Sequence, residues 1–473
     1  MGLFVVLTGC GSVASSGPDG GTDAPATGGA SGAAGAPAAG TAGVGSGTAG
    51  DSGGAGTSAG AGASGTAGSA GSSAGGASGG SPPAAFALET PVNGDPTVST
   101  TPTLSWQAAA GATTYDVEIA TSVAFGAADV AQKTGITTPS FTPTVALQPG
   151  VIYYWRVTAE GGGASVAASN APFAMSSPVN AGPSPHGVAV TPDGTTAVIT
   201  NDKPGGSVTL LDLATFATQT IALLGQPAMV AVTPDGTRAL VAEGSPNNVA
   251  ILDLAAKAIA GTVNPPCVAT TLYGIAIKAD GSAAVMPDFN GGCTKDVLDV
   301  IPLPGTTISS AIDLASSAGE FGVAVTPDGA SAIVTRGVLT TTVKRVDLAG
   351  GGLTTISNTS SSFGVAVTAD GKEALVTSGE GETIKRISLV TNAVTGTIMF
   401  ETNQDVGNIG IAHGGAVAVA VGDFKVGVLS LADGSVTSTF SLTGRSVAVT
   451  PDGHRALVTG AGAGGKVYVL ALP

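Results

Sequence analysis

A short motif that recurs seven times constrains this chain more than any other feature. The first copy, Val-Ala-Val-Thr-Pro-Asp-Gly at 188–194, returns verbatim three times, and three further copies are variants with the same apolar and glycine positions. The copies start at residues 188, 230, 275, 323, 365, 409 and 447, so neighbouring copies are 38 to 48 residues apart. A period of this length with strand-like patterning predicts a ring or stack of small, repeated β-sheets.

Each copy also predicts its own local structure. In Thr-Pro-Asp-Gly, Pro192 presets φ at the second position of a type I turn and Gly194 follows it, which closes a hairpin. We therefore expect a first strand at Val-Ala-Val, a second over 196–200 and a third over 208–213, with a fourth such as 218–223. The small residues of the first strand allow several such strands to converge on an axis.

The repeat resembles a known family. Pro-His-Gly at 185–187, the motif itself and Val-Ile-Thr-Asn at 198–201 resemble the YVTN-type β-propeller repeat over about residues 178–473. The resemblance implies an all-β chain whose residues 176–473 form a seven-bladed β-propeller. It implies little about activity, because propellers carry many functions.

The ends of the repeat region predict how the ring closes. The last repeat stops after its third strand, at 466–473, while 176–181 occupies the place of a fourth strand before the first repeat. We expect this N-terminal piece to complete the last sheet, which would leave no exposed edge.

A different pattern precedes the repeats. Large residues alternate with small or polar ones over 104–106, 115–119 and 153–157, as in a two-sheet sandwich. Leu-x-Trp, Tyr-x-Val-x-Ile and Leu-x-Pro-Gly before Tyr-x-Trp-x-Val resemble a bacterial fibronectin type III domain, here assigned to residues 84–175. The resemblance implies a spacer or binding platform, with Tyr153 or Tyr154 as the tyrosine whose hydroxyl bonds back to the backbone.

The N-terminal region predicts an anchor and a tether. Leu7-Thr8-Gly9-Cys10 follows an apolar run and resembles the lipobox of bacterial lipoproteins, so residues 1–10 are interpreted as a lipoprotein signal with a truncated basic region and Cys10 as the lipidated residue. The alternative is an ordinary cysteine in an N-terminal tail. Residues 11–83, rich in Gly, Ala, Ser and Thr, predict a disordered linker. The expected location is the cell envelope, at the outer membrane or cell surface.

Composition excludes several classes of partner. A net charge of −15 argues against nucleic acid, and three His with three Cys are too few for a His/Cys metal cluster. We expect no cofactor and a monomer, and the sequence leaves the presence of a metal ion open. In the propeller topology Cys267 and Cys293 lie on one face, where an exported protein would join them in a disulfide. Two free thiols are the alternative.

The same face carries the candidate binding residues. They come from two loop positions, two residues before each copy of the motif and seven residues after its turn glycine: His186, Tyr273, Phe321, Phe363, Arg445, Asn201, Glu243 and Asp288. The loops around them vary between repeats, as loops do when a rigid scaffold carries a specific site. The alternative is that Phe321 and Phe363 pack between blades and the charged groups are solvated.

Two functions stay open at this stage. The first is a surface-anchored module that binds a protein, a glycan or a small molecule. The second is an extracytoplasmic propeller enzyme, similar to lactonases or lyases, which would require Asn201, Glu243, Asp288 and His186 to converge. No catalytic residue is marked by local sequence, so the sequence favours binding.

Overall fold

The computed structural model describes residues 80–126, 129–244, 247–265, 274–288, 295–315, 320–337, 341–357, 359, 362–378, 382–400, 406–412, 414–462 and 464–473. Every regular element within these ranges is a β-strand. Accordingly, the described ranges contain no helix long and apolar enough to cross a membrane.

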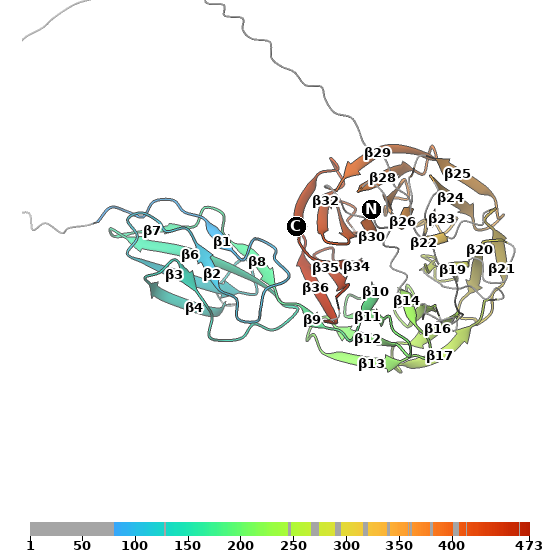
Figure 1. Ribbon diagram of the computed structural model, residues 1–473, viewed down its shortest axis with the longest axis horizontal. Helices are drawn as coiled ribbons and strands as arrows, with labels where there is room; N and C mark the ends of the chain where they lie inside the picture. Colours follow the sequence, from blue (N-terminus) through green and yellow to red (C-terminus); the bar gives the residue numbers. More distant parts are fainter. Residues whose placement is uncertain are drawn as a thin grey trace, which may run out of the picture. The chain divides into compact units, whose positions relative to one another are not determined.

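Residues 88–176 form two antiparallel sheets around one core (Figure 1). One sheet has the order β1-β2-β5, and the other has the order β4-β3-β6-β7 with β8 also paired to β6. The strands are β1 (Leu88–Thr90), β2 (Leu104–Trp106), β3 (Thr114–Ala120), β4 (Asp129–Ile136), β5 (Ser140–Phe141), β6 (Ile152–Gly161), β7 (Ala164–Ala167) and β8 (Phe173–Ser176).

The alternation in the sequence builds this core. Trp106 and Trp155 are 2 % and 0 % exposed and lie in one cluster, in which the Trp106 ring meets Tyr115 edge-on. The Tyr153 hydroxyl accepts a hydrogen bond of 3.0 Å from the Gln148 backbone N–H. Of the two tyrosines considered, Tyr153 therefore makes the expected bond to the backbone.

The repeats form seven four-stranded antiparallel sheets, and Figure 1 shows these sheets arranged in a ring. Repeated sheets of this kind are consistent with a β-propeller. We number them sheet 1 to sheet 7. Sheet 1 is β10 (Pro185–Val190), β11 (Thr196–Asn201), β12 (Ser207–Asp212) and β13 (Thr218–Ala222); sheet 2 is β14 (Pro227–Val232), β15 (Arg238–Glu243), β16 (Asn248–Asp253) and β17 (Ala258–Val263); sheet 3 is β18 (Ala276–Ile277), β19 (Ala283–Asp288), β20 (Val297–Pro302) and β21 (Ser310–Asp313).

The remaining sheets repeat the same order. Sheet 4 is β22 (Glu320–Val325), β23 (Ser331–Arg336), β24 (Thr342–Asp347) and β25 (Leu353–Ser357); sheet 5 is β26 (Ser362–Val367), β27 (Glu373–Ser378), β28 (Thr383–Ser388) and β29 (Ala393–Met399); sheet 6 is β30 (Val406–Ile411), β31 (Val417–Gly422), β32 (Val426–Ser430) and β33 (Val436–Phe440); sheet 7 is β34 (Gly444–Val449), β35 (Arg455–Gly460), β36 (Lys466–Ala471) and β9 (Val179–Asn180). First strands lie near the centre of the ring and fourth strands at its rim (Figure 1).

A threonine in the second strand connects neighbouring sheets. Thr335 Oγ1 donates a hydrogen bond of 2.6 Å to the Phe363 carbonyl of the next sheet and accepts one of 2.8 Å from the Gly322 N–H of its own sheet. A Cβ atom at Gly322 would lie 2.3 Å from the Phe363 carbonyl oxygen, so only glycine allows this approach. We call this arrangement the threonine bridge. It recurs at Thr200, Thr377 and Thr459, which donate to the carbonyls of Ala228, Gly407 and His186.

The ring closes as the sequence predicts. Val179 and Asn180 pair with Val467 and Lys466, and the Ala181 N–H donates to the Gly465 carbonyl at 2.8 Å. Val179 is 4 % exposed and lies in a core cluster shared by sheets 7 and 1. The segment just before the first repeat therefore supplies the fourth strand of sheet 7.

Candidate functional site

The face of the ring where first strands begin and second strands end differs in residue type from sheet to sheet. At this edge Pro185 pairs with Asn201, and the equivalent pair in sheet 2 is Pro227 with Glu243. Further round the ring the second strands end on Asp288, Arg336 and Ser378. We call this surface the variable face.

The opposite face is uniform. In sheet 1 the Thr191 hydroxyl donates to the Asp193 carboxylate at 2.6 Å, and the Gly194 N–H donates to the Thr191 carbonyl at 2.8 Å. The Thr191 hydroxyl is the main cause of a lowered pKa at Asp193, and the Thr195 backbone N–H adds to it. The same Thr–Asp bond occurs in sheets 2, 4, 5 and 7. This repetition fits a structural role for the turns.

Two predicted residues on the variable face, His186 and Arg445, meet through an acid that sequence reasoning missed. Arg445 of β34 donates to Asp202 Oδ2 at 3.2 Å, and the two side chains are 18 % and 11 % exposed. Burial lowers the pKa of His186; the charge of Asp202 opposes this shift and that of Arg445 adds to it. Sheets 7 and 1 thus bring a cation, an anion and a neutral imidazole together.

A fourth residue comes from sheet 2. Gln226, next to β14, donates from Nε2 to Asp202 Oδ1 at 2.7 Å. Asp202 therefore accepts from Arg445 on one oxygen and from Gln226 on the other. We call His186, Asp202, Gln226 and Arg445 the seam cluster. The signal for Asp202 in the sequence was its position directly after Asn201, at the end of a second strand.

The seam cluster leaves hydrogen-bonding capacity open. Within the described ranges, Asp202 is the one hydrogen-bond partner of the Arg445 guanidinium, which carries five N–H donors. The Nδ1 atom of His186 is buried and has no hydrogen-bond partner there either. The remaining N–H groups of Arg445 suit oxygen atoms of a ligand, and an arginine fork suits carboxylates in particular.

Glu243 supports the cluster rather than joining it. Its side chain is 3 % exposed and accepts a hydrogen bond of 3.0 Å from the Gly225 N–H, while the Gly244 N–H donates to the Gln226 carbonyl at 2.8 Å. Burial raises the pKa of Glu243, and the Gly225 bond partly opposes this. Glu243 therefore fixes the loop that carries Gln226.

Asn201 and Asp288 lie elsewhere, between sheets. Asn201 is 1 % exposed and donates to the hydroxyls of Ser207 and Thr209 at 3.0 and 2.9 Å. Asp288 is also 1 % exposed, and burial, with the charge of Asp296 adding, raises its pKa to about 6. Within the described ranges no hydrogen bond and no charge effect on a pKa joins Asn201, Asp288, Glu243 and His186 to one another. The described part of the chain contains no set of three or more His, Cys, Asp or Glu side chains able to hold a metal ion.

The other predicted residues divide into two groups. Phe363 is half-buried, and its carbonyl accepts from the threonine bridge of Thr335. Phe321 belongs to β22, but its side chain lies outside the described part of the structure. Cys10, Cys267, Tyr273 and Cys293 lie outside the described residues altogether.

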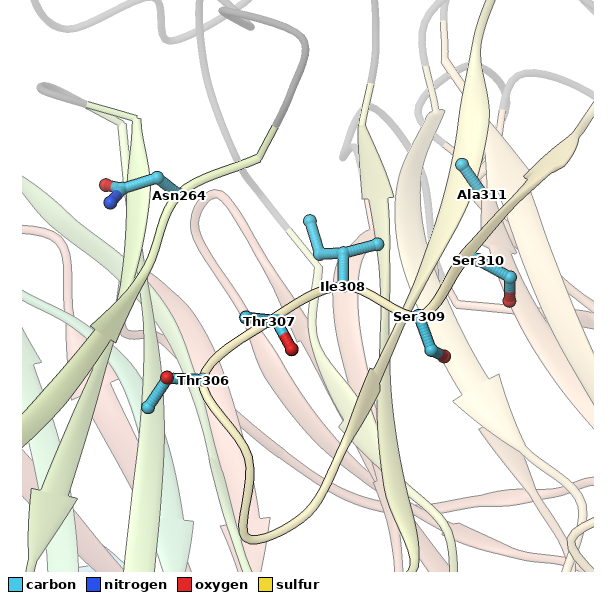
Figure 2. A pocket seen from close by; sticks show the side chains of 7 residues that line it. All are labelled: Asn264, Thr306, Thr307, Ile308, Ser309, Ser310 and Ala311. Atoms are coloured by element: carbon cyan, nitrogen blue, oxygen red, sulfur yellow. The ribbon is translucent and has the colours of Figure 1, made fainter.

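A shallow pocket that none of the predicted site residues lines lies between the outer strands of sheets 2 and 3 (Figure 2). Asn264 follows β17, and the other lining residues come from the segment that leads into β21: Thr306, Thr307, Ile308, Ser309, Ser310 and Ala311. Ser309 is already bonded to the Val300 carbonyl through its N–H at 2.9 Å and its hydroxyl at 3.2 Å. No charged side chain lines the pocket, so it offers a ligand fewer strong polar contacts than the seam cluster does.

Comparison with known proteins bears on the fold alone. No protein-family model matches this chain, and no curated protein matches it. A solved structure, hydrazine synthase from Kuenenia stuttgartiensis, is similar with a TM-score of 0.55 and 21 % identity, over 61 % of this chain and 96 % of that chain. That protein contains a β-propeller, and at this identity the likeness shows a fold consistent with a propeller and nothing about activity.

Proposed function

We propose that the chain is a lipid-anchored envelope protein in which a seven-bladed propeller of the YVTN type serves as a binding module. The seven four-stranded sheets closed by β9 support the blade count, and the threonine of Val-Ile-Thr-Asn forms the threonine bridge of sheet 1. The two-sheet arrangement of residues 88–176 and the Tyr153 bond support a fibronectin type III-like spacer before it.

The observation that carries the binding proposal is the seam cluster. Three consecutive sheets contribute to it, and among the described residues Arg445 keeps unused N–H donors and His186 Nδ1 has no hydrogen-bond partner. Arginine is a frequent anchor of binding energy at interfaces. An oxygen-rich ligand such as a glycan, whose hydroxyl groups both accept and donate, suits the Arg445 donors and the His186 nitrogen best.

A glycan array that carries both neutral and uronic-acid glycans tests this proposal. Arg445→Lys keeps a positive charge beside Asp202 but removes the planar fork, so we expect binding to weaken at least tenfold. Asp193→Asn, on the uniform face, serves as the control and should bind as the natural chain does. Equal loss in both variants, or no glycan bound by the natural chain, would refute this site.

A second candidate function rests on His186. An imidazole held neutral beside a carboxylate can act as a general base, so acid–base chemistry on a lactone or a sugar-derived substrate is the alternative. Turnover of such a substrate that is lost in His186→Gln but kept in Arg445→Lys would favour the enzyme over the binding module.

The anchor has its own test. If Cys10 is lipidated, Cys10→Ser should move the protein from the membrane fraction to the soluble fraction when both forms are exported by the same signal. Unchanged partition would remove the lipoprotein proposal while leaving the binding proposal intact.

A further inference from the structure

An acidic pair in sheet 3 is buried without compensation. Asp288 ends β19 and Asp299 lies in β20; they are 1 % and 0 % exposed. All four of their carboxylate oxygens are buried and have no hydrogen-bond partner among the described residues. Because isolated buried carboxylates are costly, this site requires a positive charge or a proton.

The strand register places the two side chains together. Asp288 pairs with Val297 and Asp299 pairs with Met286, so the two acids lie on the same side of the sheet, two residues apart along the ladder. Met286 and Ile301, on that same side, pack in a core cluster with residues of sheet 2. The acidic pair therefore lies in the seam between sheets 2 and 3.

The equivalent positions in sheet 1 hold an uncharged pair in which, within the described residues, only the Asn201 Oδ1 atom lacks a hydrogen-bond partner. Asn201 and Thr209 hold the same register positions, because Asn201 pairs with Ser207 and Thr209 pairs with Ile199. Asn201 Nδ2 donates to Thr209 Oγ1 at 2.9 Å, and Thr209 Oγ1 donates to the Ala181 carbonyl at 2.6 Å. Sheet 3 replaces both of these donors with carboxylates, which accept only.

Within the described residues, the only charges that shift the pKa values of the pair are those of other acidic side chains. Burial raises the pKa of Asp299 to about 7, and the charge of Asp288 adds to this shift. Asp296, itself 0 % exposed, raises the pKa of Asp288 in turn. No lysine or arginine contributes to either shift.

We propose that Asp288 and Asp299 bind a hard divalent cation of the calcium class in the seam between sheets 2 and 3. Such cations take six to eight oxygen ligands from carboxylates, backbone carbonyls and water, at about 2.3–2.6 Å. The described side chains supply two carboxylates, so carbonyls and water complete the shell. The carbonyl of Pro265 in sheet 2 is equivalent by register to the Ala181 carbonyl. Pro265 lies two residues after Val263, which pairs with Val249, and Ala181 lies two residues after Val179, which pairs with Val467.

Calcium titration of the full chain tests this site. The protein is stripped with EDTA, desalted, and titrated with CaCl₂ at pH 7.5 by isothermal calorimetry, with melting temperatures recorded in parallel. The variant Asp288→Asn/Asp299→Thr installs the sheet 1 pair, and Glu89→Gln/Asp212→Asn removes the same charge from exposed positions as a control.

We expect the natural chain and the control to bind one Ca²⁺ per chain and to melt several degrees higher with it. The double variant should not bind Ca²⁺, and its melting temperature should not change when Ca²⁺ is added. That temperature should equal or exceed the one of the metal-free natural chain, because the uncompensated carboxylates are gone. If it does not fold, Asp288→Asn alone serves, with at least tenfold weaker binding expected.

Three results would overturn the proposal. The first is the absence of binding heat in the natural chain. The second is unchanged binding in the variants, which would place the cation elsewhere. The third concerns the melting temperature of the natural chain as pH rises from 5 to 8. If it falls equally with and without Ca²⁺, and does not fall in the double variant, the two acids share a proton instead of binding a cation.

Discussion

The threonine bridge predicts a large effect from a nearly isosteric change, Thr335→Val. Thr335 is 0 % exposed, so the variant keeps the volume and the strand propensity but loses the hydroxyl. The strand register shifts between Glu320 and Val323, which takes Gly322 out of the β-ladder, so its N–H depends on Thr335. An unsatisfied buried N–H costs about 1–3 kcal/mol, and the lost bond to the Phe363 carbonyl adds about 0.5–1.5 kcal/mol.

We therefore expect Thr335→Val to lower the free energy of unfolding of the ring by about 2–4 kcal/mol. Urea unfolding followed by far-ultraviolet circular dichroism measures this. Tryptophan fluorescence does not, because both tryptophans, Trp106 and Trp155, lie in the N-terminal sheets. Hydrogen exchange provides a local readout, since the Gly322 amide should lose protection while amides of sheet 1 keep theirs.

Two control variants isolate the hydroxyl. Thr335→Ser restores it and should recover most of the stability. Thr354→Val, at an exposed position in β25, makes the same chemical change without a bridge and should alter stability by less than about 0.5 kcal/mol. Equal effects of Thr335→Val and Thr354→Val, or unchanged exchange at Gly322, would refute the reasoning.

Three further predictions concern the turns, the closure and the seam cluster. Because the pKa of Asp193 is lowered in the folded state, its hydrogen bonds stabilise the fold fully above its unfolded pKa of about 4, and this stabilisation is lost as pH falls through the lower folded pKa. The melting temperature of Asp193→Asn should therefore depend less on pH between pH 5 and pH 2. Val179→Asp puts a charge at a 4 % exposed position opposite β36 and should lower the melting temperature of the ring by several degrees in a calorimetric scan, whereas an unchanged scan would contradict closure by β9. An NMR titration should find the pKa of His186 below 6.5 and lower still in Asp202→Asn, because the Asp202 charge raises it; a rise in that variant would contradict the seam cluster.

The sequence alone determined the local structure and the order of the repeats. A period-two pattern, a turn with proline and glycine in fixed places and a spacing of 38 to 48 residues depend on hydrogen bonds and sterics within a few tens of residues. The predicted second strand, 196–200, differs from the observed one by a single residue at its end, and the predicted third strand, 208–213, is shifted by one residue from the observed one. The first strand begins three residues before the predicted Val-Ala-Val. Even the closing strand could be predicted, because a missing fourth strand at one end matched a spare segment at the other.

Only the tertiary structure decided which side chains of different sheets meet. Arg445 and Asp202 are separated by 243 residues, and their contact depends on how the ring closes. Asn201 and Asp288 hold the same place in the repeat, yet Asn201 has hydroxyl acceptors for its amide N–H groups and Asp288 lies among acids. A repeat fixes where a residue lies within its sheet, but the partners across a seam come from another sheet with its own sequence, so the chemistry of each seam is a property of the assembled ring.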